Sequence, residues 1–162
     1  MSTETVQITT LVENTASGAG LLAEHGLSFW IEYGDKRILF DTGQSDILIQ
    51  NAKVLGINLA QTDAIVLSHG HYDHTSGLSA VLDIATKATV YLHPAAIEPK
   101  FNRKGLEHRP IGMPEAAKKA VRSHEVVWTK TSTQVLQGIT VTGQIPRVNN
   151  FEDVGGAFFL DE

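Results

Sequence analysis

The chain of 162 residues is long enough for one domain with a buried core, and its 42% hydrophobic and 19% charged content is typical of a globular protein. A net charge of -5, without any run of Lys and Arg, argues against a nucleic-acid-binding surface. The absence of cysteine excludes disulfides, cysteine zinc sites and thiol nucleophiles. No apolar signal core or membrane-length run is seen, so we expect a cytoplasmic protein with no membrane partner.

The first part of the chain carries a series of strand signals. Alternating and β-branched residues predict strands, in chain order, at Val6–Val12, Ser28–Tyr33, Arg37–Phe40, Ala64–Leu67 and Thr89–Leu92. Gly34-Asp35 is a turn dipeptide and predicts a hairpin between the second and third strands. The uninterrupted apolar run at 64–67 is typical of a strand that is buried on both faces.

Helices are predicted between these strands. Ser45 is expected to cap a helix that ends at Gly56, Leu78–Ala85 to form a second helix, and Pro114 to begin a third. The later strands are predicted to form a terminal meander, at Glu125–Trp128, Gln134–Leu136 and Thr140–Thr142, with one more strand at Ala157–Leu160. Strands followed by helices predict an α/β fold in which helices flank a mixed sheet.

Four side chains that can ligate a metal directly follow the strand at 64–67: His69, His71, Asp73 and His74. Imidazole nitrogens and carboxylate oxygens bind zinc, iron or manganese. We expect His69 and His71 to point into one pocket, and Asp73 and His74 to face a second metal position. A histidine-rich surface loop is the alternative, but the buried strand before the cluster favours a metal site. The predicted cofactor is a divalent metal, of which up to two ions can bind. Zinc is the first choice, and iron and manganese are the alternatives.

This donor set predicts metal-assisted hydrolysis, because a bound divalent ion lowers the pKa of its water to about 7. Asp73 is the catalytic candidate, since it can bind the metal and also orient or deprotonate the water. Asp41 ends an apolar strand and can accept a hydrogen bond from the free ring nitrogen of a ligand histidine. A turn aspartate that bonds its own backbone is the alternative.

These residues give the chain a family resemblance. The spacing of the cluster resembles the His-X-His-X-Asp-His signature of the metallo-β-lactamase superfamily, and Leu39–Gly43 resembles its second hallmark. A narrower likeness is to the dihydropterin ribofuranosylaminobenzene phosphate synthase-like branch, carried by Glu13-Asn14, Leu22–Gly26, Asp41–Ser45 and Thr142–Arg147. The resemblance implies a four-layer αββα sandwich, a small-molecule substrate and support of the metal site by Asp41. It also places Arg147 near the pocket, where it would bind an anionic group; a solvated loop arginine is the alternative.

The family's complete site has further ligands in its later half: a histidine, a bridging aspartate and a last histidine. The later histidines here, His93, His108 and His124, do not lie in matching elements. The resemblance thus implies a single metallo-β-lactamase-like domain over residues 1–162 that is C-terminally incomplete, about one half of the sandwich. Two functions stay open. One is a hydrolase of a small phosphorylated or ester-type substrate. The other is a catalytically incomplete metal-binding or interaction module that is completed by a homodimer partner or a complementing C-terminal half.

Overall fold

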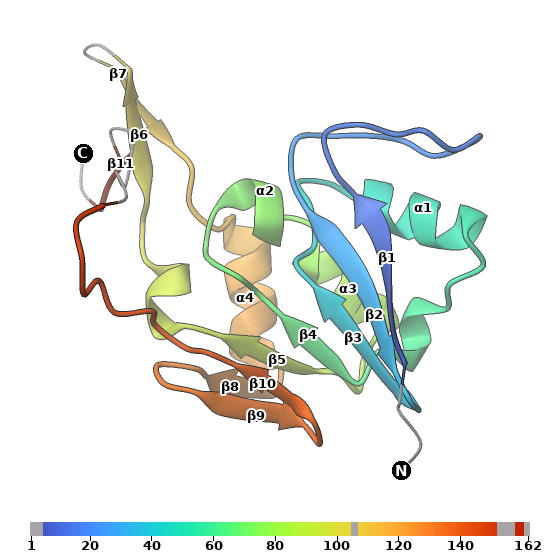
Figure 1. Ribbon diagram of the computed structural model, residues 1–162. Coiled ribbons are helices and arrows are strands. Elements are labelled where there is room, and N and C mark those ends of the chain that lie inside the picture. Colours follow the sequence, from blue (N-terminus) through green and yellow to red (C-terminus); the bar gives the residue numbers. More distant parts are fainter. Residues whose placement is uncertain (1–4, 105–106, 152–157, 161–162) are drawn as a thin grey trace.

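A six-stranded mixed sheet forms the centre of the molecule, with the strand order β1-β2-β3-β4-β5-β8 (Figure 1). The computed structural model describes residues 5–104, 107–151 and 158–160. The first three strands pair antiparallel, and the strands from β3 to β8 pair parallel. Their bounds are β1 Val6–Val12, β2 Ser28–Tyr33, β3 Lys36–Phe40, β4 Ala64–Val66, β5 Thr89–Leu92 and β8 Val126–Trp128.

The first five predicted strands are confirmed to within one residue, but the predicted terminal meander is wrong in one part. The segment at 126–128 joins the main sheet as β8, where Val126 pairs with Val90 of β5 in parallel. Only β9 (Thr133–Leu136) and β10 (Ile139–Val141) form the expected hairpin. The reason is the helix that precedes β8, because a helical crossover returns the chain to the sheet edge in the same direction as β5.

Helices cover one face of this sheet. They are α1 (Ile47–Val54), α3 (Leu78–Ile84) and α4 (Glu115–Ser123), with short helical turns α2 (Tyr72–Thr75), η1 (Leu59–Gln61) and η2 (Pro94–Ile97). The three predicted helices are confirmed with shifted ends: Asp46 is the N-cap residue of α1, and Pro114 precedes α4. Ser45 still contributes, because its Oγ accepts a hydrogen bond from Ile47 N at 3.2 Å. None of the helices in the described part of the chain combines the length and apolar character needed to cross a bilayer.

The buried core lies on both faces of the sheet. Ile65 of β4 belongs to the larger apolar cluster, which includes Leu48 of α1 and Leu78 of α3. Its neighbours Ala64 and Val66 belong to a smaller cluster against the β9–β10 hairpin. Alternate side chains of a strand point to opposite faces, so β4 is buried on both, as its apolar sequence predicts.

A projecting hairpin was not predicted. It consists of β6 (Phe101–Lys104) and β7 (Glu107–Pro110), with β11 (Phe158–Phe159) paired along β6 (Figure 1). Its sequence mixes charged and polar residues without a clear apolar alternation, so no local pattern marked it as strand. The predicted strand at 157–160 overlaps β11, although residue 157 lies outside the described residues.

Candidate metal centre

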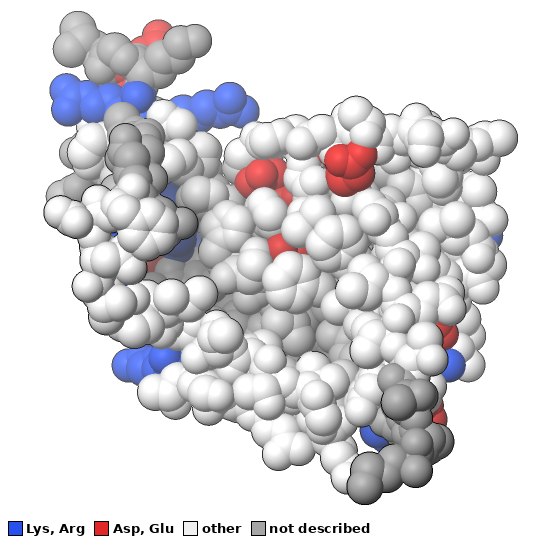
Figure 2. Space-filling model, in the orientation of Figure 1, with Lys and Arg blue, Asp and Glu red and all other residues white. Residues whose placement is uncertain are grey.

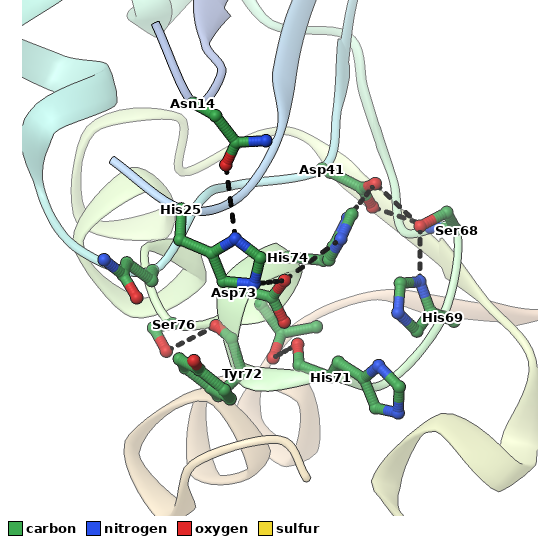
Figure 3. A network of polar contacts seen from close by, with 12 residues as sticks. Asn14, His25, Asp41, Ser68, His69, His71, Tyr72, Asp73, His74 and Ser76 are labelled. Carbon is green, nitrogen blue, oxygen red and sulfur yellow. Dashed lines mark hydrogen bonds and ion pairs between the residues drawn. The ribbon is translucent and has the colours of Figure 1, made fainter. Parts of the chain in front are cut away.

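The four residues of the predicted cluster lie together where the chain leaves β4 (Figure 3). The ring centroids of His69 and His71 are 4.5 Å apart, and those of His69 and His74 are 4.3 Å apart. Asp73 and His74 stand on α2, where His74 Nε2 lies 3.5 Å from Asp73 Oδ2. Three imidazoles and one carboxylate thus share one small volume.

Neighbouring segments hold the backbone of this loop. A Cβ at Gly70 would lie 1.9 Å from the Ala96 carbonyl oxygen, so only glycine fits between His69 and His71. Tyr72 N donates to Ile111 O at 3.0 Å. On the other side, Thr42 donates to His74 O from both its backbone N and its Oγ1, at 2.8 and 3.0 Å. The ligand-type side chains are therefore carried by a loop that is fixed at several points.

Asp41 is completely buried and joins two parts of this loop. Its Oδ1 accepts from Ser68 N at 2.7 Å, and its Oδ2 accepts from Ser68 Oγ at 2.7 Å and lies 2.8 Å from His74 Nδ1. Its φ of 58° is in the left-handed region, which costs a non-glycine residue roughly 1 kcal/mol or more. The carboxylate engages Ser68 and His74, which lie far from the turn of Asp41 in sequence, and these contacts offset the strained backbone.

The surroundings shift the pKa values of the three histidines in different directions. Burial, helped by the neighbouring rings of His74 and His71, lowers the pKa of His69 from 6.5 to about 4. Burial also lowers the pKa of His71, against the opposing charge of Asp73. Burial would lower the pKa of His74 too, but its hydrogen bond to Asp41 and the charges of Asp41 and Asp73 outweigh burial and raise it. His69 and His71 are therefore neutral near pH 7.

The donor chemistry of this cluster fits a divalent cation, because neutral imidazoles and carboxylates are metal ligands. The Asp41 contact occupies Nδ1 of His74 and leaves its Nε2 on the side of Asp73. Over residues 5–104, 107–151 and 158–160, no group of three or more His, Cys, Asp or Glu side chains is already arranged to hold an ion.

A cavity of about 990 Å³ opens beside His69. It lies between the ends of β4 and β5 and the segment that follows β10, and its lining includes Phe40, His69, His93, Lys100, Gln144 and Arg147. On the face of the molecule that Figure 2 shows, Lys, Arg, Asp and Glu are few and most of the surface belongs to other residues. Arg147 is exposed at this cavity, so the structure places the predicted anion-binding residue on the same opening as His69.

Three residues near the site were not singled out from the sequence. Lys100 lines the cavity, and burial lowers the pKa of its ammonium group. Its Nζ donates hydrogen bonds to the carbonyl oxygens of Ala95, Ala96 and Glu98. Glu24 accepts hydrogen bonds from Gln44 and Ser45, in the loop that follows Asp41, and His25 contacts Asp73. The segment Leu22–Gly26 did carry part of the family resemblance, and that signal could have marked both residues.

Comparisons with known proteins find one matching family and two curated relatives. The family model described as the metallo-beta-lactamase superfamily matches residues 22–150. An uncharacterized protein of Methanocaldococcus jannaschii is 35% identical over 144 residues, which are 88% of this chain and 54% of that protein. The 7,8-dihydropterin-6-methyl-4-(beta-D-ribofuranosyl)-aminobenzene-5'-phosphate synthase of the same organism is 37% identical over 121 residues, which are 67% of this chain and 41% of the synthase.

A solved structure agrees at the level of fold. The crystal structure of a Thermotoga maritima protein assigned to the metallo-beta-lactamases matches with a TM-score of 0.52 and 21% identity, covering 82% of this chain and 62% of that one. This match bears out the predicted fold class. The chain spans about half the length of the curated relatives it matches.

Proposed function

The chain belongs to the metallo-beta-lactamase superfamily, and from that premise we propose that it is a metal-dependent hydrolase of a small ester-type or phosphorylated substrate. The observation that carries the proposal is the packing of three imidazoles and Asp73 at the end of β4, with His74 bonded to the buried Asp41. Such a set of imidazole nitrogens and a carboxylate suits zinc, iron or manganese.

Each residue of the cluster has a proposed role. His69 and His71 supply imidazole nitrogens to one cation, and Asp73 and His74 supply donors to a second. Asp41 holds the His74 ring by Nδ1, which fixes the tautomer and leaves Nε2 for the cation. Partners of this kind typically change metal affinity by about 10- to 100-fold.

A cation held there would supply hydroxide at neutral pH and polarise a carbonyl or phosphoryl oxygen of the substrate. Asp73 is the proposed catalytic residue, because its carboxylate can orient the attacking water and accept its proton. His69, neutral down to about pH 4, stays a nitrogen donor across the physiological range.

The cavity next to His69 supports a substrate with an anionic group. Arg147 lies on its lining and can bind such a group through paired N–H donors, and Lys100 also lines this cavity. The name of one relative includes an aminobenzene 5'-phosphate, which supports the phosphorylated alternative. That name specifies a synthase, so the proposal of hydrolysis does not rest on this relative.

Metal analysis and a panel of substrates test this proposal. We expect purified protein, reconstituted with Zn²⁺, Fe²⁺ or Mn²⁺, to bind metal and to hydrolyse at least one phosphodiester, thioester or lactam probe. Chelation, His69→Ala and Asp73→Asn should each abolish turnover. A reconstituted protein that neither retains metal nor turns over any probe would contradict the proposal.

A second candidate is a metal-binding or interaction module that completes its site with a second copy or another chain. Exposed apolar side chains in the last part of the described chain favour it: Ile145, Val148, Phe151, Phe158 and Leu160. Light scattering should then detect a dimer or a stable complex. A well-folded monomer at micromolar concentration would count against this candidate.

A further inference from the structure

One histidine outside the motif reaches the candidate metal centre. His25, in the loop before β2, places its Nε2 3.3 Å from Asp73 Oδ2 (Figure 3). Its other ring nitrogen, Nδ1, lies 3.2 Å from Asn14 Oδ1. The ring thus lies between Asn14 and Asp73, residues that are far apart in the sequence. Because the His25 side chain is 67% exposed, burial in the core does not explain its position.

Glu24, the residue before His25, bonds to the loop between β3 and α1. Glu24 is 9% exposed, and its Oε1 accepts from the backbone N of Gln44 and Ser45, at 3.0 and 3.2 Å. Its Oε2 accepts from Ser45 Oγ. A nearly buried carboxylate is costly unless it is fully bonded, so these contacts fix where the segment lies.

The residue after His25 fixes the segment on the other side. Gly26 has a φ of 143°, and a Cβ there would lie 2.3 Å from the backbone oxygen of Asp73. The chain can approach the cluster this closely only with glycine. Glu24 and Gly26 therefore both secure His25 beside Asp73, although the ring itself remains open to solvent.

Asp73 Oδ2 consequently has histidine nitrogens on two sides. His74 Nε2 lies 3.5 Å away, on the same short helix, and His25 Nε2 lies 3.3 Å away, from a separate loop. A carboxylate held by one neighbour can still rotate about its Cβ–Cγ bond. Contact with a second, independently anchored ring restricts that rotation.

We propose that His25 is a positioning residue of this centre, which holds the Asp73 carboxylate in the orientation needed to bind a divalent cation. The inference rests on the proposed function, since it concerns a cation at Asp73. Residues that orient metal-binding side chains typically contribute about 10- to 100-fold in affinity.

Zn²⁺ titration calorimetry and the visible absorption of Co²⁺-loaded protein test this role in His25→Ala and His25→Gln. Glutamine keeps an N–H donor near the position of Nε2 but has no imidazole. His69→Ala serves as the ligand-loss reference. His108→Ala is the matched control, because His108 is also exposed but lies on β7 with its ring stacked on Phe159.

We expect His25→Ala to weaken Zn²⁺ binding by about 10- to 100-fold and to change the Co²⁺ spectrum, with the metal-free thermal midpoint unchanged. His25→Gln should recover most of the loss, and His108→Ala should bind as wild type. Wild-type affinity in His25→Ala, with binding lost in His69→Ala, would overturn the role of His25 and leave the proposed function standing. Equal loss in both His25 variants would also overturn it, because the ring itself would then be a ligand. A wild-type protein that binds no metal would overturn both.

Discussion

The two ends of the histidine loop differ in how firmly the fold holds them. At one end, His74 is bonded to the buried Asp41, and its carbonyl oxygen accepts two hydrogen bonds from Thr42. At the other end, the half-buried His69 borders the cavity that Arg147 also lines, and its Nδ1 lies 2.9 Å from Oγ of the adjacent Ser68. We call these the anchored end and the open end. We therefore expect the anchored end to contribute more to folding stability than the open end, which borders the cavity.

Replacing Asp41 should give the largest effect, because it removes the centre of the anchored end. Asp41→Ala leaves Ser68 and His74 without their buried acceptor, and alanine also disfavours the left-handed φ of 58°. We expect a loss of about 3 kcal/mol in the free energy of unfolding, measured with urea on metal-free protein. Asp35→Ala is the control, since the Asp35 side chain is 86% exposed. Similar losses of unfolding free energy in Asp41→Ala and Asp35→Ala would show that the contacts of Asp41 do not stabilise the anchored end.

His74→Ala and His69→Ala compare the two ends directly. Loss of His74 leaves part of the buried Asp41 carboxylate unpaired, so we expect about 1–2 kcal/mol of destabilisation. Loss of His69, at the open end, should change the metal-free stability by less than about 0.5 kcal/mol. Both variants should lose metal affinity. A larger stability loss in His69→Ala than in His74→Ala would reverse the assignment of the ends.

The pH dependence of stability should differ in sign between the two ends. The pKa of His69 is lowered to about 4 in the folded chain, so the unfolded chain binds more protons at this residue, and stability falls as pH drops from 6.5 to about 4. The pKa of His74 is raised, so its contribution is complete below pH 6.5 and declines as pH rises through the folded value.

Thermal midpoints of metal-free protein between pH 4 and 8 check these signs. His69→Gln should lose less stability on acidification than wild type does, and His74→Gln should lose less on the alkaline side of pH 6.5. Parallel pH profiles of stability for wild type and both variants would contradict the lowered pKa of His69 and the raised pKa of His74.

Arg147→Ala should have the smallest effect on the fold. Arg147 is exposed, so we expect a change within about 0.5 kcal/mol in unfolding free energy. With an anionic substrate, KM should rise about tenfold while kcat stays within about twofold, since a charge-assisted bond contributes about 1.5–3 kcal/mol. An unchanged KM for anionic and neutral probes alike would show that this residue lies outside the substrate path.

Local sequence determined the strands β1 to β5, the three longer helices and the spacing of the histidine cluster, because alternation, capping residues and motif spacing act within a few residues. Tertiary structure alone decided the parallel pairing of β8 with β5, the hydrogen bonds that Asp41 accepts from Ser68, and the approach of His25 to Asp73. The sequence predicted that Asp41 would contact a ligand histidine, and the structure shows that this histidine is His74. Each of these depends on segments brought together by packing across the sheet. Hydrophobic burial drives that packing without regard to sequence separation, so no local pattern in the chain records it.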